Sequence, residues 1–400
     1  MIYRIAWKQL WSKPLTTLLL LLVMATSIGL SVLVGTLGLG FQQGLTTATE
    51  PFTLLIGANG SSQQMVMNTV FLQDRPLSNI PYSEVEKLRN QPKLVLTAVP
   101  IAMGDSVEGF RLIGTEADIF TLRPKPKAPE WLRIDKGDVF KKPFEAVIGV
   151  DVAARTGLKV GDTFYSTHGH LAKGKSHEEH PFTVVGILDT TKGPYDQAVL
   201  TDIQSIWDLH GMKTSAETNV KGPVTTILVE PMGYSQAYQL ASSYTNRKDV
   251  QIVFPAQTIV QLFNLMGRGE QIWQPIGYLI IGLSLLVMIV TIYLSTMSRI
   301  RDYAILKTLG ASSKQLYAIL CCQSTTILIL GVVLGSIAGF SVYATIANYV
   351  TSTSAIHVPS SITLLPYPLL GLIILVGLLA SLIPLYVLQR RINSLLSSIY

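Results

Sequence analysis

Three long stretches of the sequence lack any charged side chain, and they constrain the fold more than any other feature. Residues 14–49, 271–298 and 315–389 contain no Asp, Glu, Lys or Arg. An apolar stretch longer than ~18 residues is typical of a transmembrane helix, because about 20 residues of helix span a bilayer. Charged residues make up only 14% of the chain, whereas soluble domains contain about 25%. These features exclude a wholly soluble protein and a disordered chain.

The positive charge is concentrated at the ends of these stretches. Residues 1–39, 299–314 and 390–400 hold nine Lys or Arg and a single acidic residue, Asp302, whereas acidic residues outnumber basic ones in 40–274. Short loops rich in Lys and Arg stay in the cytoplasm. We therefore expect both termini and segment 299–314 to be cytoplasmic. The net charge of +6 is explained by membrane topology, and a nucleic-acid partner is not expected.

The charge pattern predicts a membrane protein with four transmembrane helices in a one-plus-three arrangement. A large α+β extracytoplasmic domain is expected between helices one and two. The first apolar stretch is about twice as long as the core of a signal peptide, so we expect it to be retained. The predicted divisions are a cytoplasmic N-terminal segment (1–14), transmembrane helices (15–39, 275–298, 316–348 and 365–388), the extracytoplasmic domain with a helical stalk (40–274), a cytoplasmic helix (299–314), an outside loop (349–364) and a cytoplasmic tail (389–400).

The extracytoplasmic domain shows the short alternating elements of an α+β fold. The patterns predict strands at 93–100, 144–150, 162–167, 182–188, 225–230 and 250–254, and helices at 81–89, 151–156 and 234–244. Ser83 is the predicted N-cap of the first helix, with Glu86 three residues later. Segments 39–49 and 256–274 are expected to continue the membrane helices outward, as a two-helix stalk.

The cytoplasmic segment 299–311 has the pattern of a short amphipathic helix. Tyr303 and Leu306 fall at helical spacing, and Ile305 and Leu309 form the adjacent row. Such a helix between two membrane helices is suited to being pushed by a partner protein. The alternative is a simple anchor on lipid headgroups.

Two signals mark the end of this helix and the start of the next one. Gly310 suits the left-handed position that follows a helix. Ser312, with Gln315 three residues later, forms a capping box. A turn between two helices is therefore predicted here.

A histidine-rich turn in the extracytoplasmic domain is a candidate metal site. Its potential ligands are His168, His170, His177, Glu178, Glu179 and His180. Imidazole is the commonest protein ligand of zinc and copper, and such spacing can bring several rings to one ion. Two interpretations stay open, a Zn²⁺ or Cu²⁺ site and an exposed turn that is merely rich in histidine.

Small residues form a stripe on the third predicted membrane helix. Gly331, Gly335 and Gly339 recur every four residues, which permits the close approach of a helix from the same chain or from a second copy. No nucleophile, base and orienting group are recognisable together, so catalysis is not expected in this chain.

Several segments resemble the MacB/FtsX-like family of ABC transporter permeases. Residues 299–311 are similar to the family signature R-x-R-E-[IF]-G-[IL]-L-K-A-[LI]-G-A, with Asp302 in place of Glu and Ala304 in place of Gly. Residues 147–163 and 182–188 resemble two stretches of the family's outside domain. The C-terminal residues 384–394 are similar to the motif [IL]-P-A-x-x-A-x-[RK]-[IL]-N-P, with Ser instead of Pro at the end.

The resemblance implies a permease subunit of a bacterial cytoplasmic (inner) membrane that forms a homodimer. A separate ATP-binding cassette ATPase subunit would hold ATP and Mg²⁺, so no cofactor is expected in this chain apart from a Zn or Cu ion at the histidine-rich turn. The residues expected to contact the ATPase are Arg299, Arg301, Asp302, Tyr303, Leu306, Lys307, Leu309, Gly310 and Ala311.

The resemblance also implies a mechanism in which ATP hydrolysis moves the outside domain and drives export or extraction of a substrate, with a metal-linked substrate as one candidate. An extracytoplasmic adaptor or substrate-binding protein is a further candidate partner. Two alternatives stay open. One is a permease that signals to an outside partner, such as a cell-wall hydrolase, without transporting anything. The other is a membrane-anchored metal-binding receptor.

Overall fold

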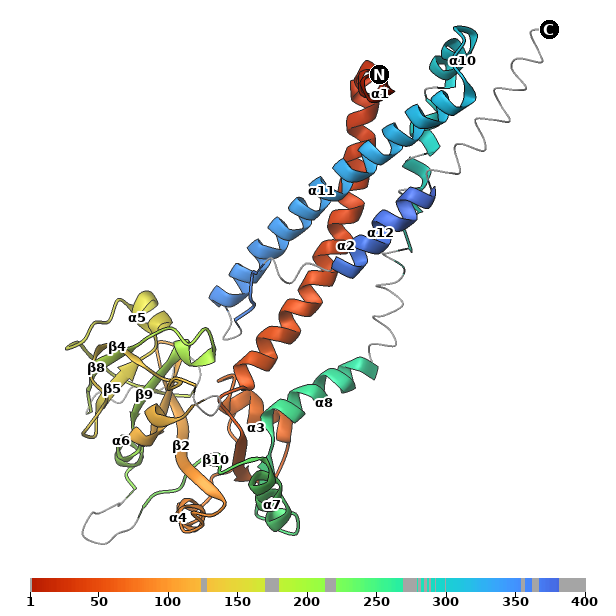
Figure 1. The fold of residues 1–400 in the computed structure, drawn as a ribbon. Helices are drawn as coiled ribbons and strands as arrows, with labels where there is room; N and C mark the ends of the chain where they lie inside the picture. Colours follow the sequence, from red (N-terminus) through yellow and green to blue (C-terminus); the bar gives the residue numbers. More distant parts are fainter. Residues whose placement is uncertain are drawn as a thin grey trace. The chain divides into compact units, whose positions relative to one another are not determined.

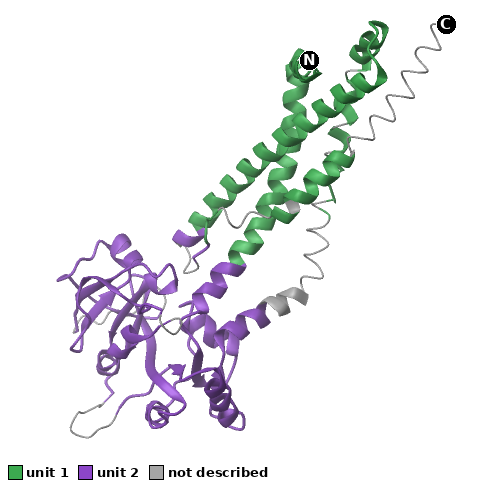
Figure 2. Cartoon of the chain, viewed as in Figure 1, with its two compact units in different colours: residues 1–41, 268–349, 359–400 green, residues 42–267, 350–358 purple. Residues whose placement is uncertain are grey.

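The described part of the chain divides into two compact units, which Figure 2 colours separately. The helical unit comprises residues 1–41, 268–349 and 359–400, and the sheet unit comprises residues 42–267 and 350–358. The computed structural model describes residues 2–123, 128–169, 180–212, 221–268, 300–353, 357–361 and 367–380, together with part of 279–298.

Helices make up the described part of the helical unit (Figure 1). They are α1 (Ile2–Ser12), α2 (Pro14–Thr49), α10 (Ile300–Thr308), α11 (Ser313–Thr353) and α12 (Tyr367–Ala380). Among the described residues, α2 and the part Ser313–Ser352 of α11 are long and apolar enough to cross a membrane. The described residues from 279 to 297 are also helical. The predicted spans 15–39 and 316–348 are confirmed as continuous helices, and the total of four spans stays a prediction.

The glycine stripe of α11 packs against α2. A Cβ atom on Gly339 would lie 2.4 Å from the carbonyl oxygen of Gly29, and a Cβ on Gly335 would lie 2.8 Å from the carbonyl oxygen of Ala25. Side chains other than hydrogen do not fit at such separations, so the two backbones approach closely only because these residues are glycine. Of the two uses open to the stripe, packing within the chain is the one seen.

The third glycine of the stripe, Gly331, faces the side chain of Met24, whose Sδ would lie 2.5 Å from a Cβ at this position. Met24 belongs to a buried apolar cluster that joins α2 to α11. Its fully buried members are Leu10, Leu21, Met24, Ile28, Val32, Ile327, Leu328, Val332 and Ile373.

A mixed 11-stranded sheet forms the centre of the sheet unit (Figure 1). Its order is β11-β1-β10-β2-β3-β9-β5-β8-β4, with β7 paired to β2 and β6 paired to β8. The β3–β9 and β5–β8 pairs are parallel, and the other described pairs are antiparallel. The strands are β1 (Leu54–Ala58), β2 (Val95–Val107), β3 (Phe110–Thr115), β4 (Ile134–Gly137), β5 (Glu145–Ile148), β6 (Thr163–Phe164), β7 (Thr167–His168), β8 (Phe182–Leu188), β9 (Ala198–Asp202), β10 (Thr226–Pro231) and β11 (Val250–Val253).

Buried side chains cover both faces of this sheet, because neighbouring strand residues point to opposite sides. Leu54 and Ile56 of β1 belong to one apolar cluster, and Leu55 between them belongs to the other. The first cluster includes α4 (Ser83–Arg89), α5 (Val150–Thr156), α6 (Ile203–Leu209) and α7 (Tyr234–Tyr244). The second cluster includes residues of α3 (Ser62–Thr69), of the 3₁₀ helix η1 (Ala117–Thr121) and of α8 (Pro255–Arg268). A second 3₁₀ helix, η2, spans Pro194–Gln197.

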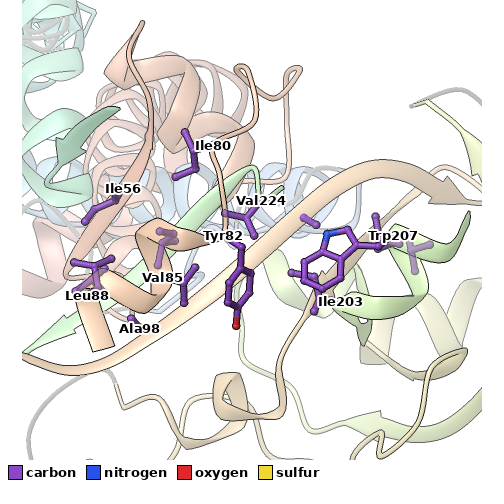
Figure 3. Packing of buried hydrophobic residues seen from close by; sticks show 14 of the residues in the cluster. Ile56, Ile80, Tyr82, Val85, Leu88, Ala98, Ile203, Trp207 and Val224 are labelled. Atoms are coloured by element: carbon purple, nitrogen blue, oxygen red, sulfur yellow. The ribbon is translucent and has the colours of Figure 1, made fainter. Parts of the chain in front are cut away.

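Figure 3 shows part of the first cluster, in which Tyr82 lies next to Trp207. Their ring centroids are 5.8 Å apart in an edge-to-face arrangement. Tyr82, and not Ser83, is the residue that precedes α4, and no side chain caps this helix. The predicted N-cap at Ser83 is therefore wrong by one residue. A turn at Pro81 and Tyr82 starts the helix instead, because the amide of Val85 already donates to the carbonyl of Tyr82.

The predicted stalk is present at the ends that belong to the sheet unit. Helix α2 continues to Thr49, and its Ala48 packs in the second cluster together with Phe52 just beyond it. Ile259 of α8 lies in the same cluster, with Leu262 half-buried against it. Both stalk helices are therefore anchored in the core of the sheet unit.

Candidate functional site

Helix α10 is held in a fixed conformation at its C-terminal end. Gly310 adopts the left-handed conformation, with φ of 92°. Its amide donates to the carbonyl of Lys307, and the amide of Ala311 donates to the carbonyl of Leu306, at 3.1 and 3.0 Å. This pair of hydrogen bonds is a Schellman motif, and it confirms the predicted role of Gly310.

The next helix begins with the predicted capping box. The Ser312 amide donates to Oε1 of Gln315 at 2.9 Å, and the Gln315 amide donates to Oγ of Ser312 at 3.3 Å. The Lys307 ammonium adds a bond of 2.9 Å to Oγ of Ser313. The turn between α10 and α11 is therefore closed by side chains on both of its sides.

The inner face of α10 is fastened to both α1 and α11. The hydroxyl of Tyr303, only 1% exposed, donates to Oε1 of Gln323. The amide group of Gln323 donates in turn to Oε1 of Gln9 on α1, at 2.7 Å. The buried apolar cluster around this network contains Ala6, Tyr303, Leu316, Ile319 and Leu320. A displacement of α10 must therefore be passed on to both neighbouring helices.

The outer face of α10 carries exposed apolar side chains. Ile305 is 58% exposed, and Leu309, the residue that follows the last residue of α10, is 78% exposed. The Leu309 amide still donates to the carbonyl of Ile305 at 3.1 Å, so the two side chains lie one helical turn apart. Leu306 is half-buried against the inner cluster, so it does not share this surface. Leu306 is one of the predicted contact residues, whereas Ile305 is not among them.

The remaining predicted contact residues fall into three groups. Arg301 is exposed and Asp302 is half-buried on α10. Tyr303 and Ala311 take part in the inner packing and are not surface groups. Arg299 lies outside the described residues.

The histidine-rich turn is only partly described. Its residues His170, His177, Glu178 and Glu179 lie outside the described part of the chain. The ring of His180 stacks on Phe144, with centroids 5.1 Å apart and planes inclined by 13°. His168, at the end of β7, lies instead beside two residues that the sequence analysis did not include in the metal set, Asp105 and His210.

Asp105, His168 and His210 form a close three-residue cluster. Nδ1 of His168 lies 3.0 Å from Oδ1 of Asp105, and Nε2 of His210 lies 3.5 Å from Oδ2. The Asp105 side chain is completely buried, whereas His168 and His210 are 46% and 28% exposed. The two rings have their centroids 5.2 Å apart. One buried carboxylate thus faces two imidazoles that are open to solvent on their other sides.

A β-bulge places Asp105 in the cluster. Gly104 and Asp105 of β2 together face the single residue Leu112 of β3. Such a bulge bends a strand and changes the direction of its side chains. From Asp105 onward β2 also pairs with β7, which sets Asp105 opposite His168. The amide of Gly169 donates to the carbonyl of Gly104 at 3.2 Å and closes this pairing.

A helix end places His210 in the same cluster. His210 is the C-cap of α6, and Gly211 after it adopts the left-handed conformation, with φ of 62°. The Met212 amide donates to the carbonyl of Trp207 at 3.0 Å, which completes a second Schellman motif. Gly114 of β3 lets α6 approach the sheet, since a Cβ there would lie 2.4 Å from Cγ1 of the α6 side chain Ile206.

Hydrogen bonding to Asp105 raises the pKa of His210, and partial burial of the ring opposes this shift. A cavity of about 200 Å³ lies beside this histidine. It is lined by Asn79, Ala102, Met103, Gly104, Ile206, Trp207, His210, Met212, Pro223 and Thr225. The cluster can therefore act as a charged hydrogen-bonded group or as a set of three metal ligands next to open space.

Comparison with protein families supports the arrangement of a membrane protein with an outside domain. The MacB-like periplasmic core domain matches residues 17–237, and the FtsX-like permease C-terminal domain matches residues 276–394. No curated protein matches the chain. The first of these domains alone covers more than half of the sequence, and the second contains α10 with its signature. The chain therefore belongs to the MacB/FtsX-like family of ABC transporter permeases.

Proposed function

We propose that this permease uses α10 to receive the motion of a cytoplasmic ATPase and passes it to the sheet unit outside the membrane, which exports or extracts a substrate. Family membership implies a multi-pass inner-membrane protein that works with a separate cytoplasmic ABC ATPase. Three further features are proposed here, namely the contact of the ATPase with α10, the route by which motion reaches the sheet unit, and the use of that motion to export or extract a substrate.

The main support for this proposal is the contrast between the buried and the exposed face of α10. The inner face is fixed by the buried Tyr303 and its hydrogen bond to Gln323. The outer face presents Ile305 and Leu309 to its surroundings. An exposed apolar pair on a rigidly held helix is suited to insertion into a pocket of a partner protein.

Two continuous helices offer a route for the motion. Helix α2 (Pro14–Thr49) and helix α11 (Ser313–Thr353) each contain residues of both units. The end of α2 is anchored in the core of the sheet unit through Ala48. A helix without a break transmits displacement along its axis better than a flexible linker, so rotation or translation of α2 would move the sheet unit.

The absence of charged residues from 14–49 and 315–389 favours movement of a substrate by the outside domain over passage through a polar channel. Channels for polar substrates place ionisable side chains at membrane depth. In this proposal the substrate is handled outside the membrane or at its outer surface, and the work is done by the sheet unit.

The substitution Leu309→Asp tests the contact directly. It should prevent co-purification of the ATPase while the permease still inserts in the membrane, because an unpaired charge would be buried in the interface at a cost of several kcal/mol. The measurement is the ratio of ATPase to permease after affinity purification, together with ATP-dependent transport or growth.

A matched control is Leu96→Asp, which introduces the same change at a 59% exposed leucine of β2 in the sheet unit. This variant should bind the ATPase like the wild type. Equal ATPase binding by the Leu309→Asp variant and the wild type would contradict the proposed contact.

A further inference from the structure

We propose that Asp105, His168 and His210 form a binding site for a divalent ion of the zinc class in the sheet unit. The site differs from the predicted histidine-rich turn, with which it shares only His168. It also goes beyond the coupling function proposed above, because it involves neither α10 nor the ATPase.

The positions of the ligand atoms fit one metal ion. One ligand atom from each of the three residues can be chosen so that all three lie within 4.8 Å of one another. Ligands that bind tetrahedral Zn²⁺ at about 2.0–2.1 Å lie roughly 3.3 Å apart. Each imidazole nitrogen already lies near this separation from one carboxylate oxygen, His168 Nδ1 at 3.0 Å from Oδ1 and His210 Nε2 at 3.5 Å from Oδ2. A small rotation of the side chains would bring both rings to a single oxygen and one ion.

The chemistry of the three ligands selects the class of ion. Two imidazoles and one carboxylate suit Zn²⁺ and neighbouring first-row transition metals, whereas Mg²⁺ and Ca²⁺ require oxygen ligands. Three protein ligands also leave a fourth coordination position for water or for a group of a ligand, as in open rather than structural zinc sites.

Burial of Asp105 gives the cluster a reason to bind a cation. Its side chain is fully buried, and buried carboxylates in proteins are paired with positive groups or coordinate metals. A metal ion held by both histidines would compensate this charge more completely than one protonated ring. The exposed sides of His168 and His210 leave a path by which an ion can enter.

Backbone hydrogen bonds and strand pairing hold the three residues close together before any ion binds. The bulge at Gly104 fixes the carboxylate, strand pairing fixes His168, and the helix cap at Gly211 fixes His210. The adjacent cavity of about 200 Å³ is far larger than the space that one water molecule needs, about 10–15 Å³. It can therefore admit the group that occupies the fourth position.

The test uses the full-length permease in lipid nanodiscs, without the ATPase. Zn²⁺ binding is measured by competition with a coloured chelator, and Co²⁺ is added as a spectroscopic probe of tetrahedral nitrogen and oxygen coordination. We expect one ion per chain for the wild type. Asp105→Asn and His210→Ala should each weaken Zn²⁺ binding by more than the ~10–100-fold that loss of an outer-shell partner costs, and should abolish the tetrahedral Co²⁺ spectrum.

Two control variants separate this site from the histidine-rich turn. His180→Ala and the double variant His170→Ala/His177→Ala should weaken Zn²⁺ binding by less than the ~10–100-fold that loss of an outer-shell partner costs, because Asp105, His168 and His210 supply the protein ligands in this proposal. Loss of binding in these variants, with retention in His210→Ala, would assign the ion to the turn and overturn the proposal. Absence of stoichiometric binding to the wild type would also overturn it.

A folding control guards against loss of the site through misfolding. His210 is partly exposed and Asp105→Asn preserves the shape of the side chain, so both apo variants should still be folded at the temperature of the binding assay, which their thermal unfolding curves will verify. If Asp105→Asn lowers the unfolding temperature so far that the variant is unfolded in the binding assay, the His210→Ala variant alone decides the outcome. Because binding is measured without ATPase or transport, its result is independent of the coupling proposal.

Discussion

Replacing Gly339 by Leu should abolish function by forcing α2 and α11 apart. A Cβ atom at this position would lie 2.4 Å from the carbonyl oxygen of Gly29 and 3.0 Å from its Cα. Backbone atoms cannot move aside as a flexible side chain can, so the whole helix must shift. We expect loss of ATP-dependent transport and a large fall in the melting temperature of the detergent-solubilised permease, because packing of small residues is the main attraction between membrane helices.

The matched control is Gly371→Leu on α12. Among the described residues, no heavy atom lies within 4 Å of a Cβ built at Gly371, other than its own helix backbone and neighbours. The same substitution should therefore leave melting temperature and transport close to the wild-type values. Equal melting temperatures and equal transport in the two variants would show that the close contact between α2 and α11 is not needed for stability or function.

Replacing Arg247 by Met should strongly destabilise the sheet unit. Glu84 is only 2% exposed and accepts hydrogen bonds from Nη1 and Nη2 of Arg247 at 2.7 and 3.0 Å. Without this partner the buried carboxylate keeps a hydrogen bond from the exposed Lys87 at 2.7 Å and a long one, 3.5 Å, from the hydroxyl of Tyr244. Removal of one partner from a buried ion pair costs about 3 kcal/mol or more. The change in the free energy of unfolding is measured by denaturant unfolding, with protease cleavage within residues 42–267 as the signal for the unfolded sheet unit.

The exposed pair Arg133–Asp189 provides the comparison. Its side chains are 59% and 44% exposed, and surface pairs contribute only about 0–1 kcal/mol. Arg133→Met should therefore change the free energy of unfolding far less than Arg247→Met does. Similar losses in both variants would refute the role assigned to the burial of Glu84.

The effect of Arg247→Met should also depend on pH. Burial pushes the pKa of Glu84 upward, but hydrogen bonds from Arg247 and Lys87 outweigh it and hold the pKa below its usual range. Stability from a carboxyl with a lowered pKa is present above the unfolded-state value, about 4.3, and is lost as the pH falls through the folded-state value. The stability difference between wild type and variant should therefore shrink below about pH 4.

Local sequence patterns predict much of this fold. Strand β8 (Phe182–Leu188) and helix α7 (Tyr234–Tyr244) have the predicted bounds, because each has a clear period and defined ends. Strands β3 and β9 were not predicted, and their parallel pairing joins segments that are far apart in the chain. A short apolar segment carries no information on its partner, so the order of strands in the sheet follows from packing of the whole domain.

The two candidate sites differ in how well the sequence predicts them, and the reason is again the distance along the chain between the residues involved. The end of α10 and the start of α11 are predictable from Gly310, Ser312 and Gln315, because a helix cap depends only on neighbours within one turn. The grouping of Asp105 with His168 and His210 depends on a bulge, a strand pair and a helix end from separate parts of the chain. A histidine count over a short window pointed to His180, which stacks on Phe144.

If α10 passes ATP-driven motion to the sheet unit, a distance between the sheet unit and α11 should change when the assembled transporter binds ATP. Spin labels would be placed at Tyr234→Cys in the sheet unit and Tyr349→Cys at the end of α11, positions that are 87% and 69% exposed. The free cysteines Cys321 and Cys322 would first be replaced by Ala. Pulsed electron paramagnetic resonance in nanodiscs with the ATPase then gives the label-to-label distance distribution with and without trapped ATP. ATP should shift this distribution in the otherwise wild-type permease, and Leu309→Asp should remove the shift. An unchanged distribution on ATP binding, or the same shift in the Leu309→Asp variant, would show that α10 does not pass the motion on.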